Sequence, residues 1–74
     1  MPLLSLVRKL SEAEERVAKD HDRIAHQREV VSRHEDEDID SAIARAILEQ
    51  LETLRRMHIA DHDWLLAEVK NQNY

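Results

Sequence analysis

The chain has 74 residues, with no cysteine, no glycine, one proline at position 2 and a net charge of −5. This length allows one small unit, whose core alone stabilises the fold only weakly unless a metal or association adds to it. The missing cysteines exclude disulfides and thiolate zinc sites. The missing glycines and the 36% of charged residues argue against a sheet with tight turns, so an all-α fold is predicted.

The first ten residues, MPLLSLVRKL, resemble the start of a secretory signal. However, Arg8 and Lys9 interrupt the apolar run, and no small-residue cleavage pattern follows. No segment reaches the roughly 20 apolar residues that a membrane span requires. We therefore expect a cytoplasmic protein that does not enter the membrane.

Residues 3–34 show the spacing of one long helix. Apolar residues recur at intervals of seven, and they are Leu3, Leu10, Val17, Ile24 and Val31. Leu6 and Ala13 fill the intermediate positions, which is the 3-4 spacing of a helix packed along its length. Ser11 and Glu14 resemble a capping box that would start a helix at Ser11. The unbroken heptad pattern favours a start near Leu3 instead.

A run of acidic residues, EDEDID, fills positions 35–40. By the sign of the helix dipole, five acidic residues destabilise the C-terminus of a preceding helix and stabilise the N-terminus of a following one. Asp38 or Asp40 is the expected N-cap of the second helix. A single continuous helix would have to tolerate clustered like charges and several aspartates. An acidic turn at 35–40 is therefore predicted, and so short a connection makes its helices antiparallel.

A second helix is predicted over about residues 41–70. Its expected apolar stripe comprises Ile43, Ile47, Leu51, Leu54, His58, Asp61 or His62, and Leu65, flanked by Leu48, Met57, Trp64 and Val69. The resulting fold is a coiled-coil-like antiparallel hairpin, one unit over residues 1–74. Both stripes are wider than one helix–helix contact, so two hairpins are expected to dimerise into a four-helix bundle. Residues expected in this core and interface are Leu10, Val17, Ile24, Val31, Ile47, Leu51, Leu54 and Leu65.

Polar residues interrupt both stripes. Asp20, Gln27 and His58 are expected to form polar core layers that fix the register of the helices. A metal site is an alternative, because His58 and His62 are four residues apart and Asp61 or Asp20 could add an oxygen ligand. The H-E-x-x-H signature is absent, however.

The triplet Asp-His-Asp occurs at 20–22 and again at 61–63. A turn centred near residue 38 would leave the two triplets about 9 Å apart along the hairpin, so a shared metal site would have to be intermolecular. Five histidines also suggest a pH response. A histidine–carboxylate pair could act as a general base, but a thin hairpin offers no pocket for a substrate, and no enzyme activity is expected.

Short motifs spread over residues 13–69 resemble a group of uncharacterised alpha-proteobacterial proteins, common in rhizobial relatives. The most specific piece is I-A-x-Q-R-E, at Ile24–Glu29, followed by H-x-x-x-x-D-x-L-L, at His58–Leu66. The resemblance implies a helical hairpin and carries over no functional residue. Those relatives often have glycine at the position of Asp38, where a left-handed residue would end the first helix. Aspartate adopts that conformation less readily.

The sequence thus predicts a non-enzymatic interaction module that binds itself as a homodimer and needs no cofactor. Another helical protein is an alternative partner. Residues 1–34 have a net charge of +1 and residues 41–74 of −1, so no basic patch is available for phosphates. Nucleic-acid binding is therefore not expected.

Overall fold

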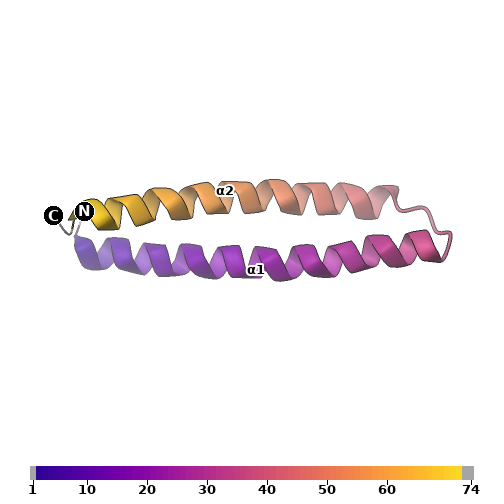
Figure 1. Cartoon of the computed structure of the whole chain (residues 1–74), viewed down its shortest axis with the longest axis horizontal. Helices are drawn as coiled ribbons and strands as arrows, with labels where there is room; N and C mark the ends of the chain where they lie inside the picture. Colours follow the sequence, from indigo (N-terminus) through magenta and orange to yellow (C-terminus); the bar gives the residue numbers. More distant parts are fainter. Residues whose placement is uncertain (1, 73–74) are drawn as a thin grey trace.

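The computed structural model describes residues 2–72, which form two antiparallel α-helices and no strand (Figure 1). Helix α1 spans Leu3–Asp36 and helix α2 spans Ala42–Gln72. Their Cα atoms fill a rod of 57 × 14 × 14 Å, and the start of α1 and the end of α2 lie side by side at the end opposite the turn. The predicted all-α hairpin is confirmed, and each helix runs two residues past its predicted end. Neither helix has the length and apolar character needed to cross a bilayer.

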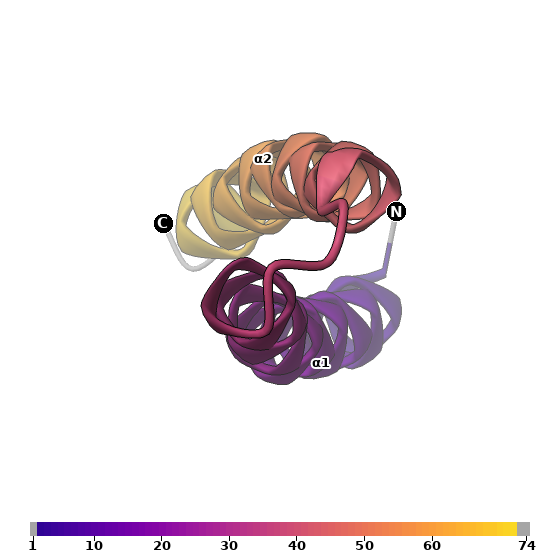
Figure 2. The same cartoon turned by 90° about the vertical axis from the view of Figure 1, so that its right-hand side faces the viewer.

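The contact surface of α1 follows the predicted heptads. Side chains that are buried or half-buried between the helices recur at 3-4 spacing, and they are Leu6, Leu10, Ala13, Val17, Asp20, Ile24, Gln27, Val31 and His34. Viewed from the turn, the helices cross at a shallow angle, as coiled-coil packing requires (Figure 2). The best-packed apolar cluster lies at the open end, where Leu6, Ala13 and Leu65 meet with Leu10 and Val69 beside them.

The contact surface of α2 shares Leu51, His58 and Leu65 with the predicted stripe, but at Ile43, Ile47 and Leu54 the residue that follows each one faces α1 instead. The residues that face α1, which we call the α2 seam, are Ser41, Ala44, Leu48, Leu51, Arg55, His58, His62, Leu65 and Val69. Ile43 and Ile47 were expected in this contact but are 78% and 43% exposed. Leu51, His58 and Leu65 of the predicted stripe lie in the seam, whereas Ile43 and Ile47 lie beside it and remain predicted residues of an interface with a second copy.

A polar residue of α1, Asp20, favours the observed orientation of α2. Asp20 lies between the helices, and a buried carboxylate needs a hydrogen-bond donor. In the observed phase α2 presents His58 to it. Rotating α2 by one residue would bring Met57 to this level instead, and methionine has no donor. The bond between Asp20 and His58 is therefore one contact that specifies which face of α2 lies against α1.

The chain reverses through a Schellman motif at the end of α1. Asp38 has φ of 57°, the left-handed conformation. The amide of Ile39 donates to the carbonyl of His34 at 2.7 Å, and the amide of Asp38 donates to the carbonyl of Glu35 at 3.3 Å. These are the two bonds that define the motif. Aspartate thus takes the conformation for which glycine is usually selected.

Asp40 then starts the second helix. Its Oδ1 accepts a hydrogen bond from the backbone amide of Ala42 at 2.9 Å. This bond satisfies one of the amides that a helix start leaves without a partner. At the other end of the hairpin, α1 begins directly after Pro2 and continues through Ser11 without a break, so the capping box is not used as a helix start.

Replacing Asp38 with glycine should stabilise the hairpin. A non-glycine residue in the left-handed region costs on the order of 1 kcal/mol, partly offset by the greater freedom of glycine in the unfolded chain. We expect a net gain of about 0.5–1 kcal/mol in a urea unfolding experiment. Asp38→Ala serves as the control, because it also removes the charge but keeps a Cβ. An equal gain from alanine would mean that charge, and not backbone conformation, limits the turn.

Candidate functional site

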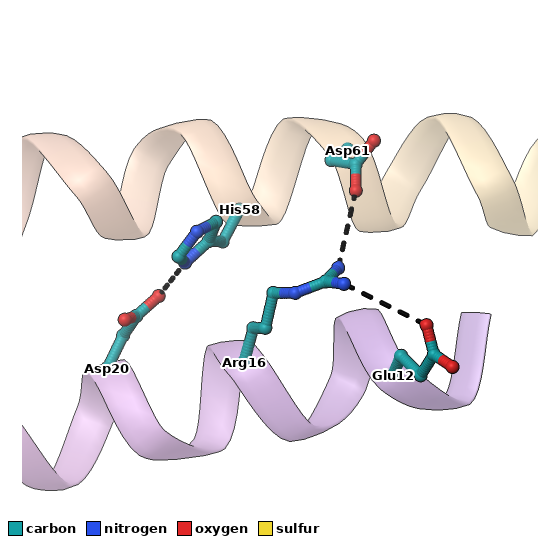
Figure 3. A network of polar contacts seen from close by, with 5 residues as sticks. All are labelled: Glu12, Arg16, Asp20, His58 and Asp61. Carbon is teal, nitrogen blue, oxygen red and sulfur yellow. Dashed lines mark hydrogen bonds and ion pairs between the residues drawn. The ribbon is translucent and has the colours of Figure 1, made fainter. Parts of the chain in front are cut away.

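The most deeply buried polar group is the carboxylate of Asp20, whose residue is 2% exposed. Its Oδ2 lies 2.5 Å from Nδ1 of His58, which reaches across from α2 (Figure 3). With Asp20 ionised, its carboxylate can only accept, and the tautomer of His58 that carries hydrogen on Nδ1 is the donor. The 3-4 spacing of both helices brings these two side chains to the same level of the contact.

Gln27 forms the second polar contact between the helices, two turns closer to the hairpin turn. Its Nε2 donates to the backbone carbonyl of Ala44 at 2.9 Å. A side-chain bond to a backbone group of the other helix resists sliding of one helix along the other. The structure thus places Asp20, Gln27 and His58, the residues expected in polar layers, in contacts between α1 and α2.

Arg16 makes a weaker contact one turn beyond Asp20, toward the open end. Its Nη2 lies 3.8 Å from Oε2 of Glu12, and its Nη1 lies 3.9 Å from Oδ2 of Asp61 on α2 (Figure 3). All three side chains are about half exposed. Exposed ion pairs of this length are worth at most about 1 kcal/mol, so this bridge orients side chains more than it stabilises the fold.

The structure does not bring together the three residues of the metal-site alternative. His58 is bonded to Asp20, whereas Asp61 faces Arg16. His62 lies 3.1 Å from Asp63 and 3.7 Å from Glu14. Within residues 2–72, no group of three or more His, Asp or Glu side chains is arranged to hold a metal ion. The two Asp-His-Asp triplets also remain separate, and only Asp20 of the first one contacts His58.

The residues expected in the core and interface divide into two groups. Ile24, Val31 and Leu65 are buried, and Leu10, Val17, Leu51 and Leu54 are half-buried. Ile47 is exposed, for the reason of helix phase given above. Leu54 and Ile47 share a side of α2 that faces away from the α2 seam, so they are available for contact with another molecule.

Two features were missed by the sequence analysis. Arg55 occupies a seam position, and its Nε is buried without a hydrogen-bond partner among the described residues. Its position could have been found by extending the 3-4 spacing from Ser41 instead of from Ile43. The second feature is a complete apolar line on the outside of α2, which the predicted stripe had merged with the contact to α1.

The line outside α2 comprises Ile43, Ile47, Leu54, Met57 and Trp64, and we call it the exposed apolar row. Met57 and Trp64 are 63% and 57% exposed. Trp64 borders a shallow groove between the helices, whose other walls come from Lys9, Glu12, Arg16, Asp61 and Leu65. This side of the hairpin therefore combines an apolar helix with basic side chains from α1.

Comparison with known proteins adds no assignment to this geometry. No family model, no curated protein and no solved structure matches this chain. The resemblance to the alpha-proteobacterial group therefore stays a prediction, and the function has to be argued from the contacts and surfaces of the hairpin.

Proposed function

We propose that this chain is a non-enzymatic interaction module that binds a second copy of itself, so that two hairpins form a four-helix bundle. The observation that carries the proposal is the exposed apolar row. Its five apolar side chains recur along one side of α2, interrupted by Gln50 and Asp61, and a large exposed apolar patch marks a site of association. Tryptophan and methionine, both present in the row, are enriched at protein interfaces.

The surface area of the chain supports the same conclusion. The hairpin exposes 5629 Å². A compact monomer of 8.7 kDa is expected to expose about 4,700 Å². The excess of about 900 Å² is close to the roughly 800 Å² that each partner buries in a standard protein–protein interface. Contact with one second copy would therefore bury an area about equal to this excess of accessible surface.

The position of the row on α2 suits a helical bundle. Each row residue directly precedes a residue of the α2 seam, as Ile43 precedes Ala44 and Trp64 precedes Leu65. One residue corresponds to a rotation of about 100° around a helix. In a four-helix bundle each helix contacts two neighbours on faces roughly at right angles to each other. The seam and the row are such a pair of faces.

Replacing Met57 with aspartate should convert the dimer to a folded monomer. The new carboxylate would be buried in the interface without a partner, which costs several kcal/mol and raises the dissociation constant at least about 100-fold. Light scattering at micromolar concentration measures the association state. Circular dichroism should show unchanged helix content, because Met57 lies outside the contact with α1.

Arg56→Asp is the control, since Arg56 is an exposed residue of the same helix and its spacing places it on neither the row nor the α2 seam. This variant should remain dimeric. If the wild-type chain itself sediments as a fully folded monomer at micromolar concentration, self-association is wrong. The row would then be the docking surface for a different helical protein.

A further inference from the structure

We infer that the second copy lies antiparallel to the first along the exposed apolar row, with the symmetry axis crossing α2 between Leu54 and Met57. This inference rests on the proposed self-association and specifies its direction and register. It follows from the spacing of the row, from its two polar positions and from the charge at the hairpin turn.

The six positions from Ile47 to Trp64 are spaced symmetrically about the midpoint of Leu54 and Met57, and Ile43 lies beyond them, opposite Glu68 of the second copy. Including the two polar residues that continue it, the row follows alternating steps of four and three along Ile43, Ile47, Gln50, Leu54, Met57, Asp61 and Trp64. When two such helices pair antiparallel about the midpoint of Leu54 and Met57, Leu54 meets Met57 of the other copy. Ile47 then meets Trp64, which places a β-branched aliphatic side chain opposite the aromatic one.

The same register pairs the two polar positions with each other. Gln50 lies opposite Asp61 of the second copy, and its amide can donate to that carboxylate. Asp61 has capacity for this bond, because its only contact with Arg16 is a long one of 3.9 Å to Oδ2. A parallel arrangement would instead place Asp61 against Asp61, and two like charges facing each other destabilise an interface.

Charge at the ends of the hairpin also selects the antiparallel direction. The turn at 35–40 carries five acids. Parallel hairpins would place both acidic turns side by side. Antiparallel hairpins bring each turn to the open end of the other copy, at the level of Arg8 and Lys9. Lys9 lines the groove beside Trp64, so it lies on the side that the second copy covers. Opposite charges then meet at both ends.

Cysteine cross-linking tests the direction and the register. The chain has no native cysteine, so Ile47→Cys and Trp64→Cys can be made as separate variants, mixed and oxidised. A disulfide needs Cα atoms within about 7 Å. In the inferred register a cysteine at 47 meets a cysteine at 64 of the other copy. Two cysteines at 47 lie 17 residues apart along the paired helices, or about 25 Å.

The mixture should therefore yield a disulfide-linked dimer containing one copy of each variant, visible by intact mass, and neither variant alone should yield one. The pair Gln50→Cys and Asp61→Cys repeats the test with Trp64 in place. Its self-linked products are excluded by a separation of about 16 Å. Light scattering of the reduced variants reports association independently of the cross-link.

The outcomes separate the two proposals. Self-linked dimers from each variant alone would show a parallel pair and overturn this inference while leaving self-association intact. Dimers in light scattering without any cross-link from either pair would mean that another face mediates association, which also overturns it. A wild-type monomer in light scattering would overturn the self-association on which the inference rests.

Discussion

Replacing His58 with alanine should lower the free energy of unfolding by about 3–5 kcal/mol, because it leaves the carboxylate of Asp20 buried without a donor. Asp20 is almost inaccessible to water, and His58 supplies its hydrogen bond from the other helix. A chain of 74 residues has a total stability of about 4–11 kcal/mol. The variant should therefore be close to unfolded without denaturant, as measured by urea titration followed by circular dichroism.

The double variant Asp20→Leu with His58→Leu is the control for this experiment. Replacing both members of a buried pair by apolar residues is often neutral or stabilising, so this variant should unfold near the wild-type urea concentration. Protein concentration has to be held constant, because association adds to apparent stability. If His58→Ala costs less than about 1 kcal/mol, Asp20 reaches water or another donor, and the pair does not control the phase of α2.

Replacing Ile24 with alanine should cost about 2–5 kcal/mol, the range for a large side chain removed from a packed core. Ile24 is 1% exposed between the helices, one turn from Asp20. In the Met57→Asp background, where the chain is expected to be monomeric, the same substitution at Ile43 should change stability by no more than about 0.5 kcal/mol, as at other surface positions. The two isoleucines are matched in chemistry and differ in helix phase, so urea unfolding of both variants measures the phase of α2 directly. Equal losses would contradict the observed seam.

Ile24 lies in the contact between the two helices of one hairpin, so a substitution there does not test the dimer interface specifically. From the sequence, Ile24→Asp is expected to abolish the oligomer. In the structure this side chain lies between α1 and α2, so a charge there would unfold the hairpin before it reported on association. Met57→Asp avoids this problem, because Met57 contacts solvent in the single hairpin. Loss of the dimer with retained helix content is then specific to the exposed apolar row.

The sequence was sufficient to predict the elements of this fold. A heptad repeat from Leu3 to Val31 and the acids at 35–40 are local signals, and local signals determine where a helix forms and where it ends. The contact face of α1 was predicted for the same reason, since its apolar residues follow a single line. The left-handed conformation of Asp38 was harder to predict, because aspartate indicates this conformation less strongly than glycine does. The backbone dihedral angle and hydrogen bonds of the structure show that Asp38 completes the turn.

The contact face of α2 was decided by the tertiary structure. This helix has two lines of suitable spacing, one through Ala44 and Leu65 and one through Ile43 and Trp64, and the second is the more apolar. The sequence of α2 alone therefore favours burial of the line through Ile43 and Trp64, which the structure leaves exposed. The choice depends on Asp20 of the other helix, which requires His58 as its hydrogen-bond donor. The face of α2 that is buried therefore depends on Asp20, which lies 38 residues before His58 in the chain. In this orientation of α2, the exposed apolar row is not covered by α1.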